Sequence, residues 1–251
     1  MVSDSELKAF LTEVLDEFYE RRIASLRRLD LHRILCKKNP YLYCSVGIRD
    51  PRRIVEAIVN AQVSSSDEGL FGDAVFEPLA LAISGGTPAP SPGVDVVRED
   101  AHTYTAYAIK SGTAVFNAQS KRKQLDEFNA LASRVRKLGK RFDPVIGYGY
   151  GRKQQRLAVN YRELAGQALW EELSGDQDCY LRIIRLLADA PVHKADEFEA
   201  ARLELIDRLV EEFRVNYCYP DGAIDWEKLV RLNSSVESPR RKKRVAPPGL
   251  L

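Results

Sequence analysis

Three charged residues of the sequence have the types and the spacing of a site that could hydrolyse a phosphodiester. Asp95 stands at the start of an apolar run, Lys110 ends the run TYTAYAIK, and Glu77 lies within the apolar stretch AVFEPLALAI. A lysine at the inner end of a strand is costly unless its charge is needed there. Two carboxylates close to Lys110 would offset that cost, so we expect the three side chains to meet.

This set of side chains predicts a Mg²⁺ site, with one or two ions. Mg²⁺ prefers oxygen ligands, and carboxylates, water and a phosphate oxygen suit it. The metal would neutralise phosphate charge and lower the pKa of a bound water. Glu77 and Asp95 are the expected ligands. Lys110 is expected to hold the attacking water and to favour its deprotonated form.

A predicted β-hairpin would bring two of these residues together. Residues 94–98 and 103–110 have strand composition and are joined by the polar turn 99–102. The start of the first strand of a hairpin lies beside the end of the second, so Asp95 and Lys110 should be neighbours. A helix packed on the same sheet would add Glu77.

The remaining elements predict an α/β core in which helices flank a small mixed sheet. A strand with a glycine-rich turn is expected at 142–151, and the Ser64 to Asp67 cluster should divide residues 51–84 into two helices. The other expected helices cover residues 4–29, 117–138, 160–173, 178–189, 195–215 and 226–232.

Composition narrows the class of protein. The chain has 251 residues, 45% hydrophobic and 29% charged, with a formal net charge of +2. No window reaches the roughly 18 uncharged apolar residues of a membrane span, and the acidic N-terminus lacks a signal-peptide core. We therefore expect a cytoplasmic protein that does not bind membranes. The scattered cysteines do not cluster with the histidines, which argues against a zinc site.

The pattern formed by Glu77, Pro92-Gly93-Val94-Asp95 and Ala108-Ile109-Lys110 resembles the PD-(D/E)XK nuclease superfamily, whose members share a four-stranded mixed sheet flanked by helices. Four further stretches resemble small prokaryotic type II restriction endonucleases, and the likeness covers most of residues 30–190. These stretches are KNPYLY (38–43), SSSDEGLFG (64–72), IKSG (109–112) and GQALWEELSGDQDCY (166–180).

The resemblance implies a site-specific deoxyribonuclease of the prokaryotic cytoplasm that cuts double-stranded DNA and leaves 5′-phosphate ends. Palindromic sites are cut by two-fold dimers, so a homodimer is expected. The implied organisation is an N-terminal helical segment (1–36), a nuclease core (37–190), C-terminal helices (191–235) and a basic disordered tail (236–251).

One position departs from the superfamily pattern. The second acid should precede the lysine by two residues, but Ala108 stands there. Some restriction enzymes of this fold take a carboxylate from a neighbouring helix instead, and Glu77 is the candidate here. Glu68 and Asp73 are rivals in the same segment. A DNA-binding relative that has lost its activity is an alternative, as is a structure-selective repair or junction nuclease of the same fold.

Residues after the predicted strand ends are candidates for DNA contact. Side-chain amides suit adenine and basic side chains suit phosphates, although Asn117 is equally suited to cap a helix. The loop GYGYGRK lacks the spacing of nucleotide-binding motifs, so a nucleotide-binding enzyme is a remote alternative. The candidates are Ser111, Asn117, Gln119, Lys121, Arg122, Lys123, Arg152 and Lys153.

Overall fold

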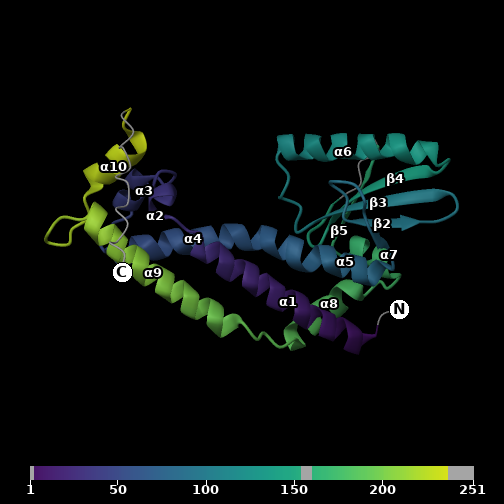
Figure 1. Cartoon of the computed structure of the whole chain (residues 1–251), viewed down its shortest axis with the longest axis horizontal. Coiled ribbons are helices and arrows are strands. Elements are labelled where there is room, and N and C mark those ends of the chain that lie inside the picture. The colour runs from purple at the N-terminus through teal and green to yellow at the C-terminus, as the bar shows by residue number, and fades with distance from the viewer. Residues whose placement is uncertain (1–2, 154–159, 237–251) are drawn as a thin grey trace, which may run out of the picture. The chain divides into compact units, whose positions relative to one another are not determined.

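The computed structural model describes residues 3–153 and 160–236, which fold into two compact units (Figure 1). Unit 1 comprises the described residues within 1–24 and 63–199, and unit 2 comprises those within 25–62 and 200–251. The predicted boundaries after residues 36, 190 and 235 stay predictions. Residues 237–251 of the predicted tail lie outside the described residues.

Unit 1 contains a five-stranded mixed sheet, one strand more than the resemblance implied. Its order is β1-β2-β3-β4-β5. The pairs β1–β2 and β2–β3 are antiparallel, and the pairs β3–β4 and β4–β5 are parallel. The strands are β1 (Thr87–Pro88), β2 (Val96–Glu99), β3 (Thr103–Lys110), β4 (Arg141–Tyr148) and β5 (Arg162–Ala165).

The predicted hairpin is confirmed by β2 and β3. Val96 lies opposite Tyr107 and Glu99 lies opposite Tyr104. Asp100 shapes the connecting turn, because its Oδ1 accepts hydrogen bonds from the backbone N–H groups of His102 at 2.7 Å and Thr103 at 2.8 Å. The register therefore places the start of β2 beside the end of β3.

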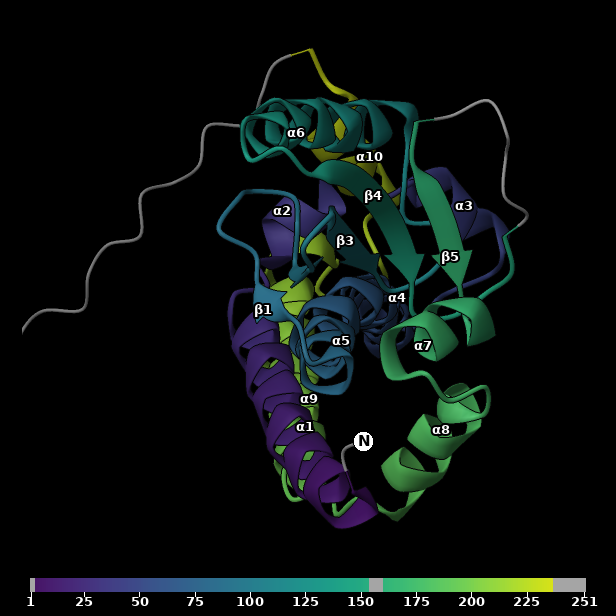
Figure 2. The same cartoon turned by 90° about the vertical axis from the view of Figure 1, so that its right-hand side faces the viewer.

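Alternating side chains cover the two faces of the sheet with different helices. Tyr107, Ile109 and Val145 pack in one apolar cluster with residues of α1 (Asp4–Arg27), α5 (Glu77–Ser84) and α7 (Gln167–Ser174). Ala108 and Ile146 face the opposite way and pack with residues of α6 (Ala118–Lys137). Figure 2 shows α6 on one side of the sheet and α5 and α7 on the other.

The predicted break at Ser64 to Asp67 is wrong. Helix α4 (Pro51–Phe71) runs through this cluster, and the polar side chains are accommodated along its surface; Ser66 Oγ, for example, donates to Val63 O at 3.0 Å. The break comes later, as a single π-helical segment, η1 (Gly72–Phe76), which leads directly into α5.

The helix predicted for residues 160–173 is also wrong in its first part. Residues 162–165 form β5, which pairs with β4, and α7 begins only after Gly166. The segment Arg-Glu-Leu-Ala has good helix formers, but pairing with β4 overrides that local preference. Ion pairs fix its place, since the Arg162 guanidinium contacts Asp143 at 2.7 Å and also contacts Glu172 of α7.

The other predicted helices agree with the structure to within a few residues. They are α1, α6, α8 (Cys179–Asp189), α9 (Ala195–Tyr217) and α10 (Trp226–Ser234). Among the described residues, no helix combines the length and the apolar character needed to cross a membrane.

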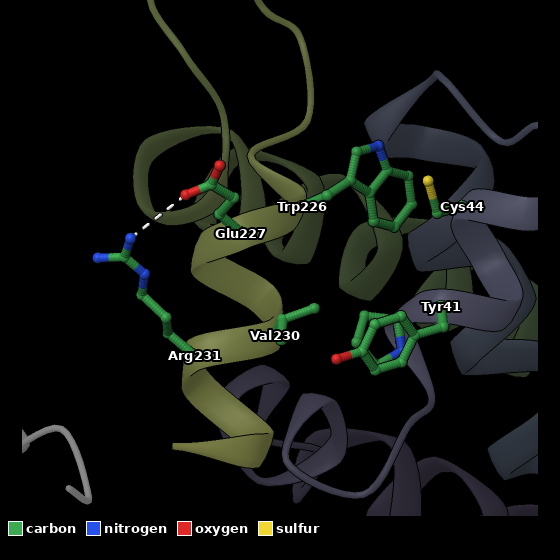
Figure 3. Close-up of a pocket in the computed structure, with 7 residues that line it drawn as sticks. Tyr41, Cys44, Trp226, Glu227, Val230 and Arg231 are labelled. Atoms are coloured by element: carbon green, nitrogen blue, oxygen red, sulfur yellow. Dashed lines mark hydrogen bonds and ion pairs between the residues drawn. The ribbon is translucent and has the colours of Figure 1, made fainter. Parts of the chain in front are cut away.

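Unit 2 consists of helices, among them α2 (Leu31–Leu35), α3 (Pro40–Ser45) and α10. Asn39 and Asp225 cap α3 and α10 through their side-chain oxygens. Between these two helices lies an open, mainly apolar pocket of about 310 Å³, in which Trp226 and Val230 face Tyr41 and Cys44 (Figure 3).

Candidate active site

Asp95 and Lys110 are brought together at the end of the β2–β3 hairpin, as predicted. Their side chains approach to 3.6 Å between Asp95 Oδ2 and Lys110 Nζ. Asp95 Oδ2 also accepts a hydrogen bond of 2.6 Å from the backbone N–H of Ile109. Lys110 Nζ donates to Ile109 O at 2.6 Å. The strand end therefore fixes both the carboxylate and the ammonium.

Glu77 joins this pair from the first turn of α5. Its Oε1 lies 3.9 Å from Lys110 Nζ. The side chains of Glu77, Asp95 and Lys110 are 28%, 21% and 27% exposed, respectively. The three groups are thus partly withdrawn from water but remain open to a ligand from solvent.

The π-helix η1 controls where Glu77 lies. The backbone N–H of Glu77 bonds to Gly72 O, five residues back, which is the π-helical pattern. Gly72 packs closely on the residue after Lys110, because a Cβ added to Gly72 would lie 3.1 Å from Ser111 Cβ. Helix and strand end are therefore in direct contact next to the candidate site.

Burial raises the pKa values of both carboxylates above their ordinary values. Burial is the main cause that raises the pKa of Glu77 to about 7, and the nearby charges of Asp95 and Asp73 add to it, whereas Lys110 opposes it. Burial also raises the pKa of Asp95, again opposed by Lys110. A bound cation would favour the charged form of both groups.

The two rivals to Glu77 have different surroundings. Asp73 lies in η1, close enough to raise the pKa values of Glu77 and Asp95. Glu68 is engaged elsewhere, since its Oε1 accepts hydrogen bonds of 2.7 Å from both Ser111 Oγ and Tyr150 OH. Of these three acids, Glu77 is the one that forms an ion pair with Lys110.

An apolar core residue stands where the superfamily pattern has its second acid. Ala108 is fully buried in the apolar cluster beneath α6, together with Val94 and Phe128. The site thus consists of two carboxylates and one lysine. In the described part of the chain, no group of three or more His, Cys, Asp or Glu side chains could hold a metal ion by itself.

The two carboxylates nevertheless fit a Mg²⁺ ion whose remaining ligands are water and oxygens of the substrate. Such ions are usually held by one or two carboxylates and complete their shell with water and phosphate oxygens. Glu77 and Asp95 provide two carboxylates whose pKa values are raised by burial, and a bound cation would favour their charged forms. These two residues are the ones that would hold the ion.

The candidate DNA contacts divide into several groups. Asn117 caps α6, where its Oδ1 accepts from Ser120 N at 2.8 Å. Ser111 is buried and bonded to Glu68. The remaining candidates at the start of α6 and after β4 are surface residues, of which Lys123 pairs with Glu127 at 3.8 Å. The exposed residues in this set are Gln119, Arg122, Lys123, Arg152 and Lys153.

Lys121 and Lys153 have a common partner that the sequence did not indicate. Their Nζ atoms lie 3.1 Å and 3.8 Å from Glu163 Oε1. Tyr148 OH donates to the same oxygen at 2.8 Å. Glu163 was missed because it lies in the segment predicted to be helical, and Tyr148 and Tyr150 because a strand-end tyrosine has no sequence signal of its own.

The fold and the site together are those of a PD-(D/E)XK restriction endonuclease-like protein: a mixed sheet between helices, with carboxylates and a lysine at one hairpin end. A family model of the type II restriction endonuclease EcoO109I matches residues 5–197. The chain belongs to this family. The match begins earlier than the likeness seen at 30–190 and includes the first helix. A search of curated proteins found no match.

Proposed function

We propose that the chain is a Mg²⁺-dependent type II restriction endonuclease that hydrolyses a phosphodiester bond at a specific double-stranded DNA site. The observation that carries this proposal is the position of Lys110 Nζ, 3.6 Å from Asp95 and 3.9 Å from Glu77 at the end of β3. The family to which the chain belongs supports the reaction class.

The roles of the residues follow from their charges. Glu77 and Asp95 hold the cation, which supplies charge neutralisation at the phosphate and a lower pKa for water. The ammonium of Lys110 orients the attacking water and stabilises its deprotonated form. Water attacks phosphorus in line, a new P–O bond forms, and the bond to the 3′ oxygen breaks. The products carry a 5′-phosphate and a 3′-hydroxyl.

A homodimer completes the proposal. A palindromic duplex site presents the same sequence to two copies related by a two-fold axis, so that each copy cuts one strand. The first helix and the C-terminal helices are the candidates for the interface. Analytical ultracentrifugation would give about twice the mass of the 28.3 kDa chain if the proposal holds, and the mass of one chain if it fails.

The test is digestion of unmethylated phage DNA with Mg²⁺. The wild type should give discrete bands, and Lys110→Ala and Asp95→Asn should give none. Lys140→Ala removes an equal charge at the other end of the sheet, where Lys140 pairs with Glu99, and should cut normally. A smear from the wild type would instead support a nonspecific or structure-selective nuclease.

Loss of activity is the second candidate, because Ala108 occupies the position of an expected acid. A protein of this kind would bind DNA and leave it intact with every divalent metal. The digestion separates the two candidates directly, provided that DNA binding is measured on the same preparation.

A further inference from the structure

A buried carboxylate lies on the opposite face of the sheet from Glu77. The side chain of Glu163 is 3% exposed, and it is the only carboxylate among the buried residues of the described chain. It extends from β5 on the face covered by α6, the face to which Ala165 also contributes. A buried charge is unfavourable unless it is paired and hydrogen-bonded, so the partners of Glu163 must stabilise its carboxylate.

Three side chains, one from α6, one from the end of β4 and one shortly after β4, converge on one oxygen of Glu163. Tyr148 OH donates to Oε1 at 2.8 Å, Lys121 Nζ donates at 3.1 Å, and Lys153 Nζ lies at 3.8 Å. Aromatic rings support both ammonium groups: Lys121 lies 5.5 Å from the ring centroid of Tyr161, and Lys153 lies 5.3 Å from that of Tyr148.

The cluster contains more positive charge than is needed to neutralise the buried carboxylate of Glu163. One carboxylate faces two ammonium groups, so the cluster retains a net charge of +1. The lysine side chains are 30% and 29% exposed, whereas the glutamate is almost completely covered. The negative charge therefore lies inside, and the two positive charges remain accessible to an anion from solvent.

The cluster is adjacent to the candidate active site. Tyr148 is the direct partner of Lys110 in the parallel β3–β4 pair, and Gly149 N donates to Lys110 O at 2.8 Å. Glu163 lies on the next strand, level with Ala108, so it is separated from Lys110 by two strand spacings and two residues along the strand, about 12 Å. This separation suits contact with a phosphate near the one that is cut.

We propose that Glu163 is a positioning residue that holds Lys121 and Lys153 together as one binding site for a DNA backbone phosphate. The proposal rests on the proposed function, since it assumes a DNA substrate. It assigns a role in DNA binding to Glu163, which does not itself contact DNA. It also explains how Lys121 and Lys153, which lie in different parts of the chain, form a single phosphate site.

Glu163→Gln distinguishes this role from simple electrostatics, because the two predict opposite signs. Removal of a negative charge should strengthen DNA binding if only net charge matters. If Glu163 positions the lysines, the variant should bind more weakly, because both ammonium groups lose their common partner. Binding is measured by the fluorescence anisotropy of a labelled 30-base-pair duplex in EDTA, which prevents metal-dependent cutting.

The salt dependence identifies the lysines that contact phosphate. Lys121→Ala and Lys153→Ala should each lower the slope of log K against log salt by about 1, as expected for one lost phosphate contact. Lys140→Ala is the matched control, because Lys140 pairs with Glu99 outside this cluster, and its slope should not change. Equal slopes for all three variants would overturn the proposal.

A mutant cycle tests the positioning role itself. Glu163→Gln should weaken binding about tenfold in the wild type but have no further effect in the Lys121→Ala, Lys153→Ala double variant, where no lysines remain to be positioned. An equal loss in both backgrounds, or tighter binding by Glu163→Gln, overturns the proposal. Tyr148→Phe removes one hydrogen bond without a change in charge, and should weaken binding in the same direction if Glu163→Gln proves unstable.

The two proposals can fail independently. Digestion of phage DNA by the wild type tests the nuclease, and the binding measurements in EDTA test the phosphate site. A wild type that cuts DNA, with variants that bind normally, would refute only the role of Glu163. A wild type that binds with the predicted slopes and never cuts would refute only the nuclease.

Discussion

The carboxylate of Asp95 accepts a hydrogen bond of 2.6 Å from the backbone N–H of Ile109, the residue directly before Lys110. This bond joins the start of β2 to the end of β3 beyond the last residue pair of the hairpin. Asp95 therefore has two roles that can be tested separately: its hydrogen bond joins the two strands, and its negative charge is proposed to hold the metal ion.

Two substitutions at Asp95 should separate these roles. Asp95→Asn keeps an oxygen for the Ile109 N–H, so its stability should stay close to that of the wild type. Asp95→Ala leaves a buried donor without a partner and should lower the free energy of unfolding by about 1–3 kcal/mol. Both variants should lose DNA cleavage. Urea unfolding and phage DNA digestion check this, and equal stability of the two variants would contradict it.

The acid that replaces the one missing at Ala108 can be identified by amide substitutions. Glu77→Gln should lower the cleavage rate by at least about 100-fold, the scale of a lost electrostatic contribution in the transition state. Asp73→Asn and Glu68→Gln should retain most of the rate, because neither carboxylate forms an ion pair with Lys110. A larger loss for Asp73→Asn than for Glu77→Gln would transfer the ligand role to Asp73.

The raised pKa of Glu77, about 7 against an ordinary value of 4.5, predicts a pH dependence of stability without metal. The folded state binds the proton more tightly than the unfolded state. This contribution is therefore fully present below about pH 4.5 and is lost as the pH rises through about 7. Between pH 5 and pH 8 in EDTA, the wild type should lose roughly 1–3 kcal/mol relative to Glu77→Gln.

Urea unfolding of the two proteins at several pH values measures this difference. Parallel curves for the wild type and Glu77→Gln would show that Glu77 titrates normally in the folded protein. Mg²⁺ should remove the difference, since it favours the ionised carboxylate, and its apparent affinity should rise with pH until Glu77 is fully charged.

The contact between Gly72 and Ser111 predicts a position that is sensitive to one methyl group. A Cβ at Gly72 would lie 3.1 Å from Ser111 Cβ and 3.3 Å from Ser111 N, so the residue after Lys110 must move. Gly72→Ala should therefore lower cleavage about tenfold or more. A shift of the reacting groups by 1 Å is enough for that effect.

Gly69→Ala is the matched control for this variant. Gly69 lies in α4, three residues earlier, and a Cβ there would meet nothing within 4 Å. Alanine is favoured over glycine within a helix by about 1 kcal/mol. Gly69→Ala should consequently raise the melting temperature and keep full activity. Equal activity of the two variants would rule out the Gly72 contact as a constraint on the site.

Arg162 should be important for stability. Its guanidinium donates to Asp143 at 2.7 Å and 3.0 Å and also bonds to Glu172, which links β4, β5 and α7. These side chains are 22% to 28% exposed. Arg162→Met would leave two partly buried carboxylates unpaired and should cost about 2–4 kcal/mol.

An exposed arginine provides the comparison. Arg231 and Glu227 form an ion pair in which both side chains are more than three quarters exposed, at 77% and 79%. Arg231→Met should have no measurable effect on thermal unfolding, since exposed pairs contribute little. A similar loss of stability in both variants would contradict the structural role of Arg162.

The strand pair of the candidate active site was predictable because its signals are local. The polar turn at 99–102 divides two runs of strand composition, and a hairpin with this turn has one consistent register. The meeting of Asp95 with Lys110 follows from that register. Glu77 required a further assumption, namely that its helix packs on the same sheet, and that assumption is correct.

The remaining features depend on contacts that the sequence does not reveal. β5 has the residues Arg-Glu-Leu-Ala, which favour a helix, and becomes a strand because β4 presents an unpaired edge. The regular helix gives way to the π-helix at Gly72 rather than at Ser64, and Gly72 packs there against Ser111, a contact between residues far apart in the sequence. Glu163 can pair with both lysines only when residues 162–165 form β5. Because these residues were predicted to be helical, the cluster around Glu163 was not predicted.

The π-helical turn between α4 and α5 also sets the rotational phase of everything that follows it. A π turn contains about one residue more than an α turn, and each residue of an α-helix rotates the chain by about 100°. If residues 72–76 formed a regular α-helix without a change in length, Glu77 would be rotated by about 90° away from Lys110, whereas a regular helix with one residue fewer would keep Glu77 in place. The position of Glu77, the proposed metal ligand, thus depends on the π-helical form of these five residues, while substitutions on the exposed side of α4 leave that phase unchanged.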